Sequence, residues 1–95
     1  MLIETPYKDG DTISLKTIAG EEVIARLEKE EDGFFHLHKP MCLVAGQQGM
    51  GLAPYMFSVS QDATFKIRDT AVACVLKTEK ELASQYTQQT TGIAV

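Results

Sequence analysis

The chain of 95 residues lacks most of the features that mark a specialised class of protein. It has no tryptophan, only two cysteines and three prolines, and no apolar run near the roughly 20 residues that span a membrane. Residues 1–11 lack the basic flank and apolar block of a secretory signal. With thirteen acidic and nine basic residues, a broadly basic nucleic-acid surface is not expected. These absences predict one small cytoplasmic domain, of a size that often depends on oligomerisation.

The excess of negative charge lies in a single segment. Residues 21–32 carry six acidic and two basic side chains, so this segment alone accounts for the net charge of −4 of the whole chain. A solvated strand and turn that aids solubility would produce this pattern. A second interpretation is a repulsive patch that keeps nucleic acid or acidic partners away from one face.

The two cysteines predict reduced thiols and no disulfide. Cys42 and Cys74 each stand within an apolar run, and the chain has no CxxC spacing. We expect both to be buried in a cytoplasmic protein.

Alternation of apolar and polar residues dominates from residue 11 to residue 77 and predicts antiparallel strands. Strands are expected over 11–18, 22–28 and 34–39, with a continuation after Pro40. Three-residue loops at 19–21 and 30–32 would place Leu15 opposite Ala25 and Leu27 opposite Phe35. The result would be a three-strand meander with one apolar face.

The second half of the chain is less regular. Residues 45–54 are rich in glycine and predict a flexible loop. Residues 55–68 fit either one long bent strand or a hairpin with its loop at 61–63. Residues 70–77 are apolar on both faces and therefore predict a strand that is covered on both sides. Thr78 and Glu81 have capping-box spacing, which predicts a helix to about residue 88.

The order of these features resembles the Sm/LSm family. The first motif of that family matches an alternating set that spans the meander, and the second matches a short set before the last strand: Ile13, Leu15, Gly20, Val23, Ala25, Leu27, Asp32 and Phe35, then Ile67, Arg68, Asp69, Val72 and Val75. Ala25, His36 and Asp69 stand where the family usually has Gly, Asn and Gly. The chain as a whole is similar to small Sm-like proteins of phage origin.

The resemblance implies a mainly β fold, namely a strongly bent, five-stranded antiparallel barrel of the SH3-like kind with a short C-terminal helix. One domain would cover residues 1–95, with an extension at 1–10, the barrel at 11–77, the helix at 78–88 and a tail at 89–95. Sm-like subunits form rings by pairing the fourth strand of one copy with the fifth strand of the next, and roughly five to seven copies are expected. The interface residues would be Phe57, Val59, Val72, Cys74 and Val75.

The resemblance also implies single-stranded RNA at the pore of the ring. Carried over by position, the RNA-binding residues would be Asp32, Phe34, His36, Arg68 and Asp69. Phe34 and His36 would stack on bases, and Arg68 would contact a base or a phosphate. A competing interpretation pairs Arg68 with Asp69 as a local ion pair at a turn.

Other chemistry has little support in the sequence. No nucleophile–base pattern, phosphate-binding glycine motif or paired carboxylates are present, so we expect neither an enzyme nor a cofactor. His36 and His38 share a strand face, but two visible ligands do not predict a metal site. The alternative function, from a different class, is a structural or regulatory ring that contacts phage or host proteins through residues 45–54 or the helix, without nucleic acid or membrane.

Overall fold

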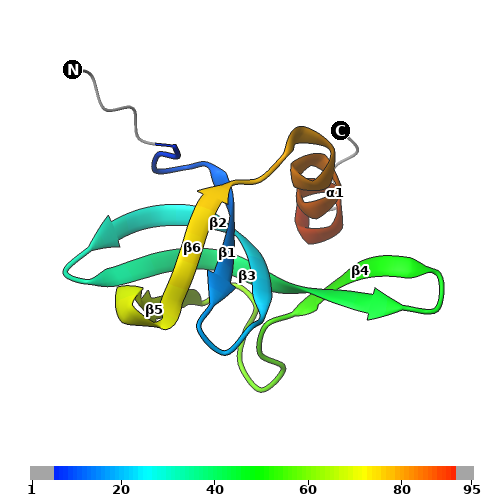
Figure 1. The fold of residues 1–95 in the computed structure, drawn as a ribbon, viewed down its shortest axis with the longest axis horizontal. Coiled ribbons are helices and arrows are strands. Elements are labelled where there is room, and N and C mark those ends of the chain that lie inside the picture. The colour runs from blue at the N-terminus through cyan, green and yellow to red at the C-terminus, as the bar shows by residue number, and fades with distance from the viewer. Residues whose placement is uncertain (1–5, 92–95) are drawn as a thin grey trace.

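The computed structural model describes residues 6–91. It consists of one antiparallel sheet and one C-terminal helix, as Figure 1 shows. The strands are β1 (Thr12–Thr17), β2 (Glu22–Glu31), β3 (Phe34–Gly46), β4 (Gly49–Pro54), β5 (Thr64–Arg68) and β6 (Val72–Lys77). A 3₁₀ turn, η1 (Asp69–Ala71), joins β5 to β6, and the helix α1 covers Lys80–Thr91.

The mainly β class and the C-terminal helix are confirmed, but the predicted five-stranded barrel is wrong in two respects. The described residues form six strands, and their sheet does not close into a barrel. Its order is β4-β3-β2-β1-β6, and β5 pairs with β3 on the same edge as β4. The extra strand arises because β4 and β5 lie end to end along β3, where the sequence suggested a loop followed by one long bent strand or a hairpin.

The β1–β2 hairpin has the expected polarity but a different register. Leu15 lies opposite Val23 rather than Ala25, because the three-residue loop begins one residue earlier, at Ile18. The Thr17 N–H donates to the Glu21 carbonyl at 2.9 Å and closes this loop. Gly20, with φ of +107°, supplies the left-handed backbone that the loop needs.

The β2–β3 hairpin turns at Asp32-Gly33, so the predicted loop at 30–32 is wrong. Asp32 (φ +54°) and Gly33 (φ +80°) both have positive φ, as a two-residue turn of type I′ requires. Glu31 therefore pairs with Phe34, and Leu27 lies opposite Leu37 rather than Phe35.

Two bulges interrupt the β2–β3 ladder, one at Glu28 and one at Lys39-Pro40. At the second bulge Lys39 has φ of +50°, and proline has no N–H to donate to the ladder. Beyond this point β3 leaves the body of the molecule and pairs with β4. Figure 1 shows this β3–β4 hairpin projecting away from the rest of the sheet.

The predicted flexible loop at 45–54 is therefore wrong, since Met41–Gly46 and Gly49–Pro54 are paired from Met41↔Pro54 to Gly46↔Gly49. Neither interpretation of 55–68 is confirmed, because only Thr64–Arg68 forms a strand and residues 55–63 are irregular. The Gln61 side-chain amide donates to the carbonyls of Met56 and Val59, at 2.8 and 3.2 Å, and this holds the irregular segment folded on itself.

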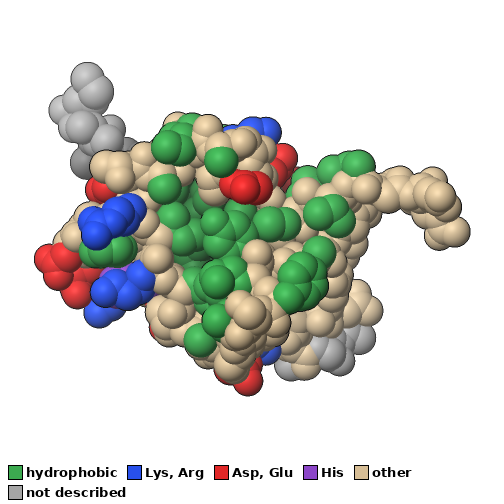
Figure 2. Space-filling view, turned by 90° about the horizontal axis from the view of Figure 1, so that it is seen from below, with side chains coloured by type: hydrophobic (Ala, Val, Ile, Leu, Met, Phe, Trp, Pro, Cys, Tyr) green, Lys and Arg blue, Asp and Glu red, His purple; other side chains and the backbone are tan. Residues whose placement is uncertain are grey.

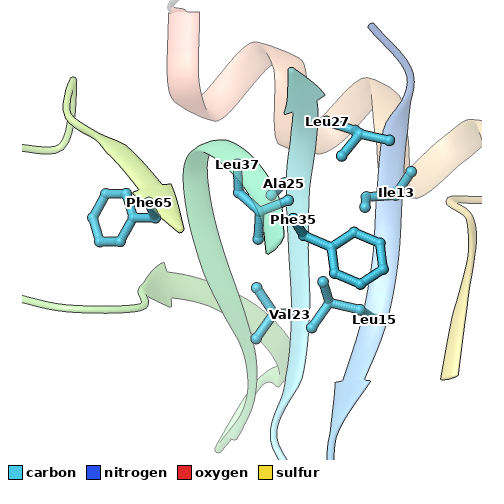
Figure 3. Close-up of a cluster of buried hydrophobic side chains, with 8 residues drawn as sticks. All are labelled: Ile13, Leu15, Val23, Ala25, Leu27, Phe35, Leu37 and Phe65. Carbon is cyan, nitrogen blue, oxygen red and sulfur yellow. The ribbon is translucent and has the colours of Figure 1, made fainter. Parts of the chain in front are cut away.

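The main core and the helix lie on opposite faces of β2. The core joins residues of β1, β2, β3 and β5, and Figure 3 shows those of β1, β2 and β3 close together and Phe65 of β5 to one side: Ile13, Leu15, Val23, Ala25, Leu27, Phe35, Leu37 and Phe65. This alternation is the pattern that the sequence predicted. Burial of these side chains is the main contribution to stability, at about 25 cal/mol per Å² of apolar area removed from water.

A second, smaller core lies under the helix. Ile24, which interrupts the polar face of β2, is fully buried there together with Met41 and Tyr86. Figure 1 shows α1 above the sheet, on the side away from β5. No helix within residues 6–91 is long and apolar enough to cross a membrane.

The helix runs from Lys80 to Thr91, so the predicted end near residue 88 is too early. The predicted cap is also wrong. Glu79, not Thr78, accepts hydrogen bonds from the N–H groups of Glu81 and Leu82, at 3.2 and 2.8 Å. Thr78 is buried, and its hydroxyl bonds the Ser14 hydroxyl at 2.8 Å instead. The rest of the expected tail, and residues 1–5 of the expected extension, lie outside the described residues.

Tyr86 links the helix to the bulge in β3. Its hydroxyl accepts a hydrogen bond from the Arg26 N–H at 3.2 Å and lies 2.9 and 2.8 Å from the carbonyl oxygens of His38 and Lys39, to which it donates. These backbone groups flank the bulge, where the ladder cannot satisfy them. Burial raises the pKa of Tyr86 to about 12, despite the opposing effect of the Arg26 N–H.

Replacement of Tyr86 by Phe should lower the free energy of unfolding by about 1–3 kcal/mol, because the Arg26 N–H and two carbonyl groups lose a buried partner. Urea denaturation followed by circular dichroism measures this change. Tyr55→Phe is the matched control, since the structure gives the Tyr55 hydroxyl no hydrogen bond within residues 6–91. Equal stabilities of the two variants would contradict the role assigned to Tyr86.

Candidate nucleic-acid interface

The five residues predicted to bind RNA are brought together at one end of the sheet. The β2–β3 turn carries Asp32 and leads into Phe34 and His36, and β5 ends at Arg68 and Asp69. The Asp69 N–H donates to the Gly33 carbonyl at 2.9 Å, which joins the two turns directly. We call this place the turn junction. Residues far apart in the sequence meet here because β5 pairs with the first half of β3.

Alternate residues of β3 and β5 form a polar strip on the side away from the main core. The pairs are Phe34↔Arg68, His36↔Lys66 and His38↔Thr64, and opposed residues of an antiparallel pair point to the same side. The residues between them, which include Phe35, Leu37 and Phe65, belong to the main core. We call these six side chains the basic–aromatic strip.

Phe34 lies at the end of the strip next to the turn junction. The Lys66 Nζ lies 4.6 Å from the centroid of its ring, and the Arg68 Cζ lies 4.9 Å from the same point. Both distances are within the range of cation–π attraction, which contributes about 0.5–1 kcal/mol at an exposed site. The ring of Phe34 therefore already contacts two cations of its own chain.

The expected ion pair between Arg68 and Asp69 is not formed, although both residues are exposed and adjacent. The ion pairs found in residues 6–91 join Lys29 to Glu31 at 3.3 Å, His38 to Glu28 at 3.9 Å and Lys39 to Asp62 at 3.6 Å. Arg68 lies over Phe34 instead, so its guanidinium is not neutralised by a carboxylate of this part of the chain.

Acidic side chains of β2 contact the strip on one face of the sheet and Tyr7 on the other. Glu28 accepts a hydrogen bond from the Thr64 hydroxyl at 2.9 Å and lies beside His38. Glu30 accepts from the Tyr7 hydroxyl at 2.8 Å, and burial together with this carboxylate raises the pKa of Tyr7 to about 12. Figure 2 shows basic side chains next to acidic ones at this end of the molecule. The negative charge of 21–32 thus meets the strip at Thr64 and His38, whereas Lys66 and Arg68 form no ion pair within residues 6–91.

Lys66 is the residue of this surface that sequence reasoning missed. The alternation of residues 64–68 indicates that Lys66 is on the polar face of its strand. Its approach to Phe34 depends on the pairing of β3 with β5, which the sequence did not predict. His36 and His38 lie on one face as expected. Within the described residues, no group of three or more His, Cys, Asp or Glu side chains is placed to hold a metal ion.

The predicted subunit-interface residues lie in two places. Val72 and Val75 are half-buried against the main core, and Cys74 is exposed. Phe57 is 80% exposed and Val59 is 40% exposed, but they belong to the irregular segment 55–63 and not to the expected strand. The prediction of two buried thiols is wrong, because Cys42 is half-buried and Cys74 exposed; both are free. Burial, and secondarily Glu21, raises the pKa of Cys42.

Beside β6 lies a shallow groove of about 350 Å³. It is lined by Ser14, Leu15, Lys16, Glu22, Cys74 and Leu76. Within residues 6–91, β6 pairs only with β1, so the other edge of β6 and one side of its side chains are open. The strand expected to be covered on both faces is thus covered on one face by its own chain.

A scan of the sequence against protein-family models found no match, and neither did a search of the curated proteins.

Proposed function

We propose that the chain forms an Sm-like homo-oligomeric ring that binds single-stranded RNA at the turn junction. One observation carries the proposal: Phe34 and Arg68 lie opposite each other, next to the Asp69–Gly33 hydrogen bond. The two residues are more than thirty positions apart in the sequence. A flat aromatic group, an unneutralised guanidinium and a polar turn are the components of single-strand recognition. Family membership and RNA binding are parts of the same proposal.

The open edges of the sheet support assembly into a ring. The β6 edge lies at one end of the strand order, and β4 and β5 lie at the other. Exposed edges normally carry charges or proline to prevent pairing, whereas in β6 the exposed residues Ala73, Cys74 and Leu76 are uncharged and the charge of Lys77 stands at the end of the strand. Pairing of one end with the opposite end of the next copy is head-to-tail, and it closes into a ring when the rotation permits. Roughly five to seven copies would suit a subunit of this size.

The free thiols favour a reducing compartment. We therefore place the ring in the cytoplasm, or in the host cytoplasm if the chain is encoded by a phage.

A second candidate function is a ring that binds phage or host proteins, and the β3–β4 hairpin favours it. No charged residue stands between Lys39 and Asp62, and within that stretch Val44, Met50 and Phe57 are exposed. Methionine suits an adaptable contact, and exposed apolar groups on a projecting hairpin are typical of an interaction surface. The partner would be another protein with an apolar surface.

Replacement of Leu76 by Lys should abolish the ring and leave a folded monomer, because a charge would be desolvated at the open edge of β6. Native mass spectrometry gives the copy number, and circular dichroism checks the fold. Ile18→Lys is the control, since Ile18 is exposed in the β1–β2 turn, on the side of β6 that already pairs with β1. A wild-type chain that remains monomeric at all concentrations would contradict the ring.

Arg68→Ala should weaken binding of short oligo-U and oligo-A at least tenfold, because the substitution removes a cation from the turn junction. Fluorescence anisotropy across a salt series measures the affinity, and Lys80→Ala is the control at an exposed site on α1, away from the β6 edge. Absence of saturable binding by the wild type at low salt would contradict the RNA function and leave the protein-binding ring as the better candidate.

A photoreactive side chain placed at position 50 should give one discrete cross-link to a different protein if the second function is correct. The same group at position 18, which is also exposed, should not give that product. Identical product patterns from the two positions would show that the hairpin has no special contact.

A further inference from the structure

Phe34 and the two cationic residues that contact its ring, Lys66 and Arg68, suggest different roles within the proposed RNA site. Predicted from position alone, Phe34 would stack on a base. Its ring is already contacted by Lys66 Nζ at 4.6 Å and by Arg68 Cζ at 4.9 Å. A base that stacked on this ring would have to displace these contacts. The two cations are therefore more accessible to a ligand than the ring is.

We propose that Phe34 is a platform that holds Lys66 and Arg68 in place, and that these two cations contact consecutive phosphates of a single-stranded RNA along β5. The inference rests on the proposed function, and it adds Lys66 as a binding residue and makes Phe34 a positioning residue. It also extends the site from the turn junction along the basic–aromatic strip.

The spacing of the two residues along β5 suits this ligand. Residues 66 and 68 are two apart on one strand, so their side chains leave the same face about 7 Å apart along the strand. Neighbouring phosphates of an extended single strand have a comparable separation. The guanidinium of Arg68 is planar, so it can bind a phosphate at its edge while a base stacks on its outer face.

The charges around the strip also favour an anionic ligand. Lys66 and Arg68 form no ion pair within residues 6–91, although the chain has a net charge of −4. The nearby carboxylates of Glu28 and Glu31 are held by Thr64 and by Lys29, at 2.9 and 3.3 Å. The two cations are therefore available to phosphate without first losing a carboxylate partner.

The test uses the full-length protein and fluorescently labelled oligo-U. Lys66→Gln should weaken binding several-fold at low salt and reduce the slope of log affinity against log salt by about 0.7, the value for one phosphate contact on a single strand. Lys80→Gln, which removes an exposed lysine at the start of α1, outside both the strip and the β6 edge, is the matched control and should change neither quantity.

A double-mutant cycle tests the platform. Phe34→Leu should weaken binding in the wild type but have little further effect when Lys66 and Arg68 are both replaced by Gln, because the ring then has no cation to position. Phe34→Tyr keeps the ring and should retain the affinity. An undiminished effect of Phe34→Leu in the double variant would mean that a base stacks on the ring, and would overturn the platform.

The outcomes separate this inference from the proposed function. If Arg68→Ala weakens binding while Lys66→Gln behaves like Lys80→Gln, the phosphate contact by Lys66 is wrong and the turn junction remains the RNA site. If the wild type binds no oligonucleotide, both proposals are wrong. Circular dichroism of every variant ensures that a lost affinity does not reflect a lost fold.

Discussion

The division of β3 at Lys39-Pro40 is the constraint on which the rest of the structure depends. Before this point β3 pairs with β2 and β5, and after it β3 pairs with β2 and β4. Proline cannot donate a ladder hydrogen bond, and positive φ at Lys39 turns the strand. One strand therefore serves both the body of the molecule and the projecting hairpin. Tyr86 makes the bulge tolerable by bonding backbone groups that would otherwise be buried without a partner.

The same division determines where the candidate site forms. β4 pairs only with the second half of β3, from Met41 onward, so the first half of β3 is free to pair with β5. That pairing sets Arg68 opposite Phe34 and brings η1 against the β2–β3 turn. A continuous β3–β4 hairpin along the whole of β3 would exclude β5 and separate the two turns. Strand architecture and the turn junction are thus consequences of one backbone irregularity.

The sequence predicts the core of this protein better than its registers. Alternation identified the buried residues of β1, β2 and β3, because a sheet with one buried face requires apolar residues at every second position. It failed at the bulges, since one inserted residue reverses the alternation without any change in composition. The Asp32-Gly33 pair is a sequence signal for a two-residue turn, because such a turn requires positive φ at both positions. The structure turns at this pair and not at the acidic residues 30–32.

Other features could not be read locally. Glycines at 46, 49 and 51 suggested a loop, yet the cross-strand pairs there form a regular hairpin. Within this hairpin, Leu43 and Leu52 pack against the second, smaller core under the helix. Thr78 and Glu81 fit a capping box, but the buried Ser14–Thr78 hydrogen bond takes the hydroxyl away from the helix. Each of these outcomes depends on a partner distant in sequence. For the same reason the residues of the turn junction were predicted from a family pattern, while the Lys66–Phe34 contact was visible only in the fold.

The distribution of charge argues that the two proposed contacts use separate surfaces. The acidic residues of 21–32 follow β2 to the turn beside the basic–aromatic strip, whereas the stretch between Lys39 and Asp62 has no charge at all. An acidic border would restrict a bound nucleic acid to the strip, because phosphates away from Lys66 and Arg68 would meet carboxylates. An uncharged hairpin has no such electrostatic preference and gains from contact with apolar surface. A ring with RNA at its turn junctions would therefore leave its projecting hairpins free for protein contacts, so the two candidate functions do not compete for the same residues.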